Sequence, residues 1–490
     1  MSAGAESNDL ATLSAAAALR GFRSGQFSPV DLLESVMTRI QEDARRPQRQ
    51  RINAVVQVLE QGMDSARHAA DRWARGTDLE QVPLLGLPVA TKEKHGIDGE
   101  PLSEGILARA DHRAGADHPV IRRIRAAGGV LHARTTSPEL SCATVTHSGL
   151  WGVTRNPWNP ELSPGGSSGG AGAALAAGFA PLATASDIAG STRIPAGFTG
   201  TVGYKAPYGR IPGRPPLSAD WYRGDGPMAR TVEDVRLLYT VMAGVDPADH
   251  TTVPGPPVPA AQEAPESWLM GRRVGVSVTL GDYLVHPDVR QVLEELKDTL
   301  TRGGAEVHEV QLPWTSDHLR AVSMAHFGHL LLGGMRAATD GAPELADYTR
   351  RFMADAEAAA SRMTLFETLA AEAKIQQELS EAMRRVDVLV APVSATDGLR
   401  ADASYLDGID LAGPSGRSEH LTHYWQAHMT VPFNIANRCP VISTPAGFAT
   451  NGLPVGVQWI GRPYDEPAVF AVAAAWESLS PWTGLAPAWA

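Results

Sequence analysis

Amphipathic helical patterns alternate with short apolar runs along this chain, and that alternation limits the folds open to it. Residues 118–135, "HPVIRRIRAAGGVLHART", hold a helical pattern, a glycine pair and then an apolar run. The same order recurs in residues 286–313, and "VDVLVAP" at 386–392 is typical of a buried strand. Because helices and strands alternate, we expect an α/β fold in which helices cover a sheet.

A chain of 490 residues can hold two or three average domains or one large α/β domain. Residues 1–75 carry helical periodicity, with Ser28 as an expected N-cap and Pro29 at the first helical position. We expect them to form a helical arm or cap on a single α/β domain at 76–490. Two features of that domain are also predicted: a Pro-rich surface connection at 253–267 and a helical excursion at 315–386.

The composition disfavours several classes of binding partner and indicates the cellular compartment. A formal charge of −11 disfavours nucleic acid and anionic membrane surfaces as main partners. The two cysteines, Cys142 and Cys439, are too few for a disulfide framework and fit a reducing compartment. No signal peptide is expected, because the N-terminus lacks a basic region followed by an unbroken apolar run. We therefore expect a soluble, cytoplasmic protein.

Three polar residues stand out because of where the local pattern places them. Lys92 lies near the end of the strand pattern "LLGLPVATKEK", Ser167 lies in "PGGSSGGAG", and Ser191 lies in "ATASDIAGSTRIP". The spacings between them are 75 and 24 residues. The nearest preceding histidine, His147, is 44 residues from Ser191, and no GxSxG motif frames Ser191. A histidine-based triad therefore does not explain how this serine becomes a nucleophile.

The glycine-rich stretch around Ser167 permits two interpretations. Ser167 and Ser168 each match GxSxG, but a nucleophile elbow requires a strand that runs directly into it. The preceding segment "NPWNPELSP" is rich in Pro and Asn, so a glycine-rich turn before an Ala-rich helix is an equal alternative. A phosphate-binding loop is disfavoured, because neither GK[ST] nor a GxGxxG after a strand is present.

Two histidine-rich stretches leave a metal-dependent hydrolase open as a lower-ranked alternative. The candidate ligands are His326 and His329 in "HFGH" and His420, His423 and His428 in "HLTHYWQAH". Neither stretch contains HExxH, and no nearby carboxylate completes an obvious third ligand, although Glu419 is adjacent. We expect no metal and no other cofactor.

Seven motifs in order from about residue 25 to 480 resemble the amidase signature hydrolases, whose hallmark is a Ser–Ser–Lys triad. They are "GLPVATKEKHGIDG", "LHARTTSPELS", "GVTRNPWN", "PGGSSGGAGAALAAG", "SDIAGSTRIPAGFTGTVGYKAPYGRIP", "GPMARTVED" and "GLPVGVQWIGRPYDE". The resemblance implies an α/β fold with a large mixed sheet flanked by helices on both faces. It also implies that Ser191 is the nucleophile, Lys92 the base, and Ser167 the bridging hydroxyl, preceded by a cis peptide bond.

These implied roles are chemically reasonable. A lysine accepts a proton only when neutral, so burial must lower its pKa from about 10.4. Ser167 can accept a proton from Ser191 while it donates its own to Lys92. The expected oxyanion hole consists of the backbone N–H groups of Ile188, Ala189, Gly190 and Ser191. Residues expected to support the loops through hydrogen bonds are Ser168, Asp187 and Arg193.

Departures from the family pattern narrow the expected function. "ASDIAGS" has Ala185 and Ala189 where the family usually has glycine, and a similar Ala occurs in the more distantly related 6-aminohexanoate cyclic dimer hydrolase. The chain also resembles urethanase-type amidases, which cleave carbamates. We expect a small-molecule amide or carbamate substrate and a monomer or homodimer. The segment "TRIPA" differs from the pattern expected of an amidotransferase-type subunit that works with a partner chain, so that alternative is disfavoured.

Side chains around the substrate are harder to predict. The expected pocket residues are Leu140, Ser141, Cys142, Arg210, Tyr424 and Trp425. Cys142 is expected to form a small pocket wall rather than a second nucleophile. Arg210 lies on a Gly/Pro-rich loop and is either a gate over the cleft or a solvated surface group. Tyr424 and Trp425 are either aromatic walls of the pocket or ordinary core residues.

Overall fold

One mixed sheet of eleven strands forms the centre of the computed structural model, in the order β1-β3-β2-β6-β8-β7-β14-β15-β11-β9-β10. Its strands are β1 (Val55–Val58), β2 (Pro88–Lys92), β3 (Val130–Thr135), β6 (Leu182–Asp187), β7 (Val202–Lys205), β8 (Gly224–Ala229), β9 (Arg273–Val276), β10 (Glu306–Glu309), β11 (Val388–Pro392), β14 (Val441–Phe448) and β15 (Pro454–Ile460). β2 is parallel to β3 and β6, and β9 is parallel to β10 and β11. The other neighbouring pairs are antiparallel. The predicted α/β fold with a mixed sheet is confirmed.

The structure describes residues 9–76, 80–260, 262–340, 342, 344–413, 417–482 and 487. Residues 1–8 of the expected arm and residue 261 of the expected Pro-rich connection lie outside this description, as do 77–79, 341, 343, 414–416, 483–486 and 488–490 of the expected domain. The helices of the described chain are α1 (Ala15–Ser24), α2 (Pro29–Arg45), α3 (Gln61–Ala74), α4 (Pro119–Ala126), α5 (Gly169–Ala176), α6 (Arg193–Thr199), α7 (Val232–Met242), α8 (Pro287–Arg302), α9 (Ser316–Leu330), α10 (Leu332–Thr339), α11 (Asp347–Arg362), α12 (Leu365–Met383), α13 (Pro432–Ile435) and α14 (Glu466–Leu479).

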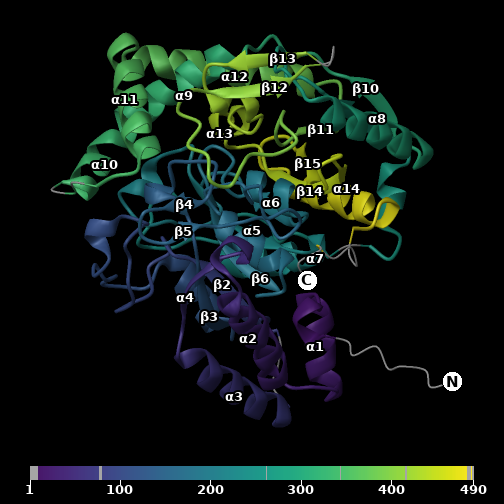
Figure 1. Ribbon diagram of the computed structural model, residues 1–490. Coiled ribbons are helices and arrows are strands. Elements are labelled where there is room, and N and C mark those ends of the chain that lie inside the picture. The colour runs from purple at the N-terminus through teal and green to yellow at the C-terminus, as the bar shows by residue number, and fades with distance from the viewer. Residues whose placement is uncertain are drawn as a thin grey trace.

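The helices lie around the sheet, with two groups at opposite ends of the molecule (Figure 1). Helices α1–α3 lie at the end nearest the N-terminus, and α9–α11 lie at the other end. None of the helices in the described part of the chain combines the length and apolar character needed to cross a bilayer.

Local sequence signals explain several element boundaries. Ser28 caps α2: its side chain accepts from the Asp31 N–H, the Asp31 carboxylate accepts from the Ser28 N–H, and Pro29 occupies the first turn. The Asp465 carboxylate caps α14 by accepting from the Ala468 N–H. β2 ends at Lys92, as the apolar run before that lysine predicts.

The N-terminal segment is joined to the sheet. β1 lies within residues 1–75 and pairs antiparallel with β3, so this segment contributes an edge strand as well as the expected helices. The carboxylate of Asp234, on α7, accepts hydrogen bonds from the N–H groups of Ala15 and Ala16. These contacts fix α1 against the body of the protein.

Two short hairpins stand outside the main sheet. β4 (His147–Ser148) pairs with β5 (Gly152–Val153), and β12 (Ile409–Ala412) pairs with β13 (Ser418–Leu421). The second hairpin lies where the Gly-, Asp- and Ser-rich composition predicts only a loop. Its strand Ile409–Ala412 alternates buried and exposed residues, and that alternation is the signal for a strand.

Candidate active site

Lys92 lies at the carboxyl end of β2 and is completely buried. Its Nζ atom lies 2.7 Å from Ser167 Oγ, 2.9 Å from Ser168 Oγ and 3.2 Å from Ser186 Oγ. The Lys92 N–H donates to Thr184 Oγ1, on the neighbouring strand β6. Three hydroxyl groups thus surround the amine, and no carboxylate in the described residues forms an ion pair with it.

The charge state of Lys92 follows from this environment. Burial lowers the pKa of the amine well below its ordinary value, and the cation of Lys94 lowers it further. Asp225 raises the pKa in part, but it does not offset the loss of solvation. A neutral amine has one lone pair, so Lys92 can accept a proton from one of its serine neighbours.

Ser167 and Ser168 stand directly before helix α5, and the Gly166–Ser167 peptide bond is cis, as the resemblance implies. The Ser168 N–H donates to the Ser191 carbonyl at 3.2 Å, which joins the two serine loops. Ser167 is buried, while 6% of Ser191 is exposed. That small exposed fraction matters, because a nucleophile must meet its substrate.

The Ser191 loop connects β6 to α6. It also makes a close contact with the segment before α13. Gly190 has a φ of +114°, and a Cβ placed on it would lie 2.0 Å from Thr430 Oγ1. Thr430 Oγ1 donates to the Ala189 carbonyl at 2.6 Å. Within the described residues the Ser191 hydroxyl has no hydrogen-bond partner, so it is free to approach a carbonyl carbon.

The expected set of four oxyanion donors needs one correction. The Gly190 N–H donates to Asp187 Oδ1 at 2.7 Å, so it is already engaged inside the protein. No hydrogen bond of the described chain uses the N–H groups of Ile188, Ala189 or Ser191, which leaves these three available. Ala189 is not among the residues with positive φ, so the replacement of glycine is sterically acceptable there.

Asp187 and Arg193 form a buried ion pair behind the Ser191 loop. The Arg193 Nη2 atom lies 2.9 Å from Asp187 Oδ1, and both side chains are almost fully buried. Asn434 Nδ2 also donates to Asp187 Oδ1, and Arg193 donates to Asn434 Oδ1 and to the Thr430 carbonyl. These bonds hold the pKa of Asp187 well below its ordinary value despite burial, so the carboxylate stays charged.

Ser167 and Ser191 line one cavity of about 290 Å³. Leu140, Ser141 and Cys142 line it too, and the first two have φ values of +50° and +57°. Two consecutive non-glycine residues with positive φ are uncommon and tend to occur at functional sites. Burial raises the pKa of the Cys142 thiol to about 12, so this side chain is a wall and not a competing thiolate.

A family model described as Amidase matches residues 31–470 of the chain. This chain belongs to the amidase signature family. It is 34% identical over 491 residues to an acylamidase of Rhodococcus erythropolis, covering 97% of each chain. It is 31% identical over 492 residues to a glutamyl-tRNA(Gln) amidotransferase subunit of Symbiobacterium thermophilum, covering 96% of this chain and 97% of the relative.

Solved structures agree with this membership. A bacterial aryl acylamidase of the family superposes with a TM-score of 0.84 at 26% identity, covering 96% of this chain and 97% of the other. A 6-aminohexanoate cyclic dimer hydrolase superposes with a TM-score of 0.78 at 26% identity, covering 98% and 99%. The chain is therefore an amidase-family enzyme that hydrolyses C–N bonds.

Two of the expected pocket residues of this amidase lie elsewhere. Arg210 is neither a gate nor a solvated group: it is buried, its Nε lies 2.5 Å from Glu466 on α14, and its Nη1 donates to the Pro254 carbonyl. Tyr424 lines a separate small cavity and stacks on His423. Trp425 does line the cavity of Ser167 and Ser191, as expected.

The sequence did not predict which residues form the apolar wall of the cavity that Ser167 and Ser191 line. Its residues come from the helical excursion α9–α11: Phe327, Leu331, Met335, Ala338 and Phe352. Four of them recur at spacings of three or four residues between 327 and 338, a pattern typical of a helical face, although the structure divides it between α9 and α10 at Leu331. That spacing shows that the face is apolar, but it does not say what the face covers.

The five histidines of the two histidine-rich stretches form polar contacts with other residues of this amidase. His326 lies between Glu372 and Asp220, at 2.8 and 2.9 Å, and His329 Nε2 donates to the Met363 carbonyl. The partners of the other three are Asp410 for His420, Asp355 for His423, and Thr144 with Ser394 for His428. None of the five belongs to a group of three ligand atoms within the described chain.

The structure does bring together two other groups of possible ligand atoms. One is His286 with Asp288 and Asp397, and the other is the buried set His95, His118 and Asp225. In the buried set, the His118 Nδ1 accepts from the Val120 N–H, so the proton of neutral His118 is on Nε2 and faces Asp225 at 3.5 Å. His95 Nε2 lies 3.0 Å from the same carboxylate. Hydrogen bonding accounts for this arrangement without an ion.

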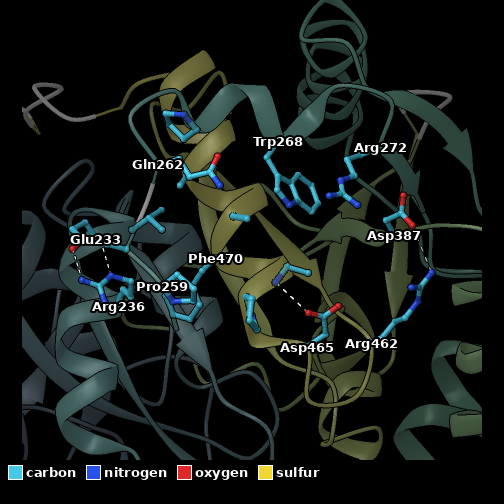
Figure 2. Close-up of a pocket in the computed structure, with 17 residues that line it drawn as sticks. Glu233, Arg236, Pro259, Gln262, Trp268, Arg272, Asp387, Arg462, Asp465 and Phe470 are labelled. Atoms are coloured by element: carbon cyan, nitrogen blue, oxygen red, sulfur yellow. Dashed lines mark hydrogen bonds and ion pairs between the residues drawn. The ribbon is translucent and has the colours of Figure 1, made fainter. Parts of the chain in front are cut away.

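A larger cavity of about 390 Å³ lies along α14, away from the serines (Figure 2). Trp268 and Phe470 form part of its wall. Figure 2 shows Arg236 paired with Glu233, at 2.6 Å, and Arg462 facing Asp387, at 3.7 Å. Among the described residues that line it there is no serine, cysteine or lysine, so they offer no hydroxyl, thiol or amine nucleophile.

Proposed function

We propose that this amidase cleaves the C–N bond of aryl amides and aryl carbamates through an acyl-enzyme on Ser191. Ser167 and Lys92 relay the proton. The observation that carries this proposal is the 2.7 Å contact between Lys92 Nζ and Ser167 Oγ, inside the cavity that Ser191 lines. A buried amine with a lowered pKa beside a serine hydroxyl is a general base that requires no histidine.

In the first step, Ser191 Oγ forms a bond to the substrate carbonyl carbon. The Ser191 proton passes to Ser167 Oγ while the Ser167 proton passes to Lys92 Nζ, which becomes an ammonium. The carbonyl oxygen gains the negative charge and accepts from the N–H groups of Ile188, Ala189 and Ser191. Losing one such donor typically costs about 2.7–4 kcal/mol of transition-state stabilisation.

In the second step, the C–N bond breaks and the relay runs in reverse. Lys92 returns its proton through Ser167 to the leaving nitrogen, which departs as a neutral amine. Water then attacks the acyl-enzyme with the same base and releases the acid and the free Ser191 hydroxyl. For a carbamate, the product is a carbonic acid monoester, which loses CO2 to give an alcohol, so amides and carbamates need the same machinery.

The cavity wall supports an aromatic substrate group. Phe327, Phe352 and Trp425 line the cavity beside several aliphatic side chains, and a flat ring packs well on such a surface. The acylamidase relatives point to the same class of substrate. A glutamine substrate, which an amidotransferase would use, has no aromatic group to pack on this wall.

The experiment measures amine release from a matched aryl amide and aryl carbamate. The enzymes are the wild type, Ser191→Ala and, as a matched control, Ser380→Ala, whose exposed hydroxyl on α12 donates only to the Gln376 carbonyl. We expect the wild type and the control to release amine from both substrates, and Ser191→Ala to release none. Activity on the amide alone would remove carbamates from the proposal, and an active Ser191→Ala enzyme would overturn the mechanism.

A further inference from the structure

Two cations that line the cavity of Ser167 and Ser191 form no ion pair within the described residues. Lys94 and Arg223 both line the cavity and both are half-buried. Neither side chain donates a hydrogen bond or joins an ion pair within the described residues, and the Arg223 Nε atom is buried without any hydrogen-bond partner. A partly desolvated cation without a partner is unfavourable, so its persistence at a site requires an explanation.

Three carboxylates act electrostatically on Lys94, and each of them contacts a different side chain. Glu104 accepts from Arg109 at 2.9 Å, and Asp225 accepts from His95 at 3.0 Å. The Oδ1 atom of the Asp220 carboxylate lies 2.9 Å from His326 Nε2, while its Oδ2 atom is buried without a hydrogen-bond partner. None of these carboxylates forms an ion pair with Lys94 or Arg223 in the described chain, so they favour the Lys94 cation only through space.

Buried arginines elsewhere in the molecule show the usual arrangement. Arg193 is paired with Asp187, and Arg210 with Glu466. Both pairs are internal and complete. The unpaired cations are found where the catalytic cavity meets an adjoining cavity of about 160 Å³, since Lys94 and Arg223 line both.

We propose that Lys94 and Arg223 form a carboxylate subsite, so that this amidase favours substrates carrying an anionic group as well as an aromatic one. The inference rests on the function proposed above for the same cavity. A guanidinium group binds both oxygens of a carboxylate, and an ammonium adds a point charge beside it. The pKa of Lys94 is lowered to about 8, chiefly by burial, so the amine is still mostly a cation at pH 7.

A different role for the same cations is electrostatic. Both Lys94 and Arg223 lower the pKa of Lys92, so they help to keep the base neutral. That effect acts on every substrate alike, whereas a carboxylate subsite acts only on substrates with the negative charge. The ratio of the rates for an anionic and a neutral substrate separates the two roles.

The test compares two matched pairs of substrates in the wild type, Lys94→Met and Arg223→Gln. One pair is N-acetyl-4-aminobenzoate and its methyl ester, with the charge on the leaving amine; the other is glutaric acid monoanilide and its methyl ester, with the charge on the acyl group. We expect kcat/KM to favour the acid over the ester in at least one pair. Each substitution should lower that ratio about tenfold, which corresponds to about 1.4 kcal/mol.

Arg236→Gln is the matched control, because Arg236 lines the other cavity and is paired with Glu233. It should leave the ratio unchanged. Equal losses on acid and ester, together with a shifted pH profile, would mean that the cations act only through Lys92 and would overturn the subsite. A wild type that hydrolyses the esters at least as fast as the acids in both pairs would overturn it as well.

A binding measurement keeps this result independent of turnover. Calorimetry with Ser191→Ala and N-acetyl-4-aminobenzoate or glutaric acid monoanilide should detect binding of at least one acid, and Lys94→Met in the same background should weaken it about tenfold. If the wild type hydrolyses neither ester nor acid but this binding is present, the proposed hydrolysis fails while the subsite stands. Undetectable binding of both acids to Ser191→Ala overturns the subsite.

Discussion

The cavity along α14 and the serine cavity, which Ser167 and Ser191 line, differ in whether their charged groups are paired. Around the cavity along α14, Arg236 is paired with Glu233, and the Arg272 guanidinium lies over the Trp268 ring at 5.0 Å (Figure 2). Around the serine cavity, Lys94 and Arg223 have no partner among the described residues, and the Ser191 hydroxyl is free. The first cavity is the larger, at about 390 Å³ against about 290 Å³. Unsatisfied polar groups, and not volume, therefore distinguish the reactive site.

Removing the base should produce the largest difference between the two cavities. We expect Lys92→Met to lower kcat by about 10³-fold or more, since a general base and its relay act as a unit. Arg236→Met, in the cavity along α14, should leave kcat within twofold of the wild type. A comparison of kcat on one aryl amide checks both, and a loss of similar size in the two variants would contradict the assignment.

The same base sets the pH dependence on the acid side. The pKa of Lys92 is lowered by burial, and the amine is active only when neutral. As the pH falls through that pKa, Lys92 gains a proton, so kcat/KM of the wild type should fall. The residual activity of Lys92→Met should lack this acid limb, and a pH series continued downward until the wild type loses half of its activity would reveal the difference.

A buried and an exposed ion pair should differ in their contribution to stability. Asp187→Asn leaves Arg193 buried without its counter-charge, and such a loss typically costs about 3–5 kcal/mol. Asp387→Asn, beside the other cavity, breaks a partly exposed pair with Arg273, where about 0–1 kcal/mol is typical. Urea unfolding of the two variants measures the difference, and equal midpoints would show that the Ser191 loop does not depend on this pair.

The apolar wall should matter for aromatic substrates. Phe352→Leu removes a ring from the catalytic cavity, and we expect kcat/KM for an anilide to fall about tenfold, within the ~0.5–1.5 kcal/mol that aromatic pairs contribute beyond area burial. A matched aliphatic amide should be affected less. Phe366→Leu, whose ring is 80% exposed on α12, is the control. Equal losses on both substrates would remove the wall from substrate recognition.

Salt should give the smallest effect. If Lys94 and Arg223 bind a carboxylate, the ratio of acid to ester rates should fall a few-fold between about 0.05 and 0.5 M NaCl, because salt screens the attraction between partly exposed charges. The esters should show little change. A ratio that does not respond to salt would indicate that the preference arises from shape.

Some parts of the fold and of the site follow from the sequence because they depend on neighbours in the chain. The end of β2 at Lys92, the cap at Ser28 and the helix from residue 466 are each set by local pattern and capping chemistry. The order and spacing of the seven motifs indicate the family, and with it the mixed sheet. The ion pair of Asp187 with Arg193 also joins residues only six positions apart.

Other parts depend on contacts between distant segments, and the sequence could not supply them. Arg210 was expected near the cleft, but Glu466, 256 residues further on, holds it in a buried pair. The Gly190 N–H was expected to face the substrate, but the Asp187 carboxylate, held by Asn434, accepts from it. In both cases the polar group contacts a carboxylate inside the protein, because the opposite charge attracts it, and it is therefore not left to face the substrate.

By itself, the sequence determined the family, the three residues of the proposed relay and the local elements that carry them. Only the tertiary structure decided which helices form the apolar wall, which N–H groups remain available, and which cations lack a partner. The physical reason is that helical and strand patterns depend on residues a few positions apart. Pairing and desolvation depend on whatever side chain the folded chain brings within about 4 Å.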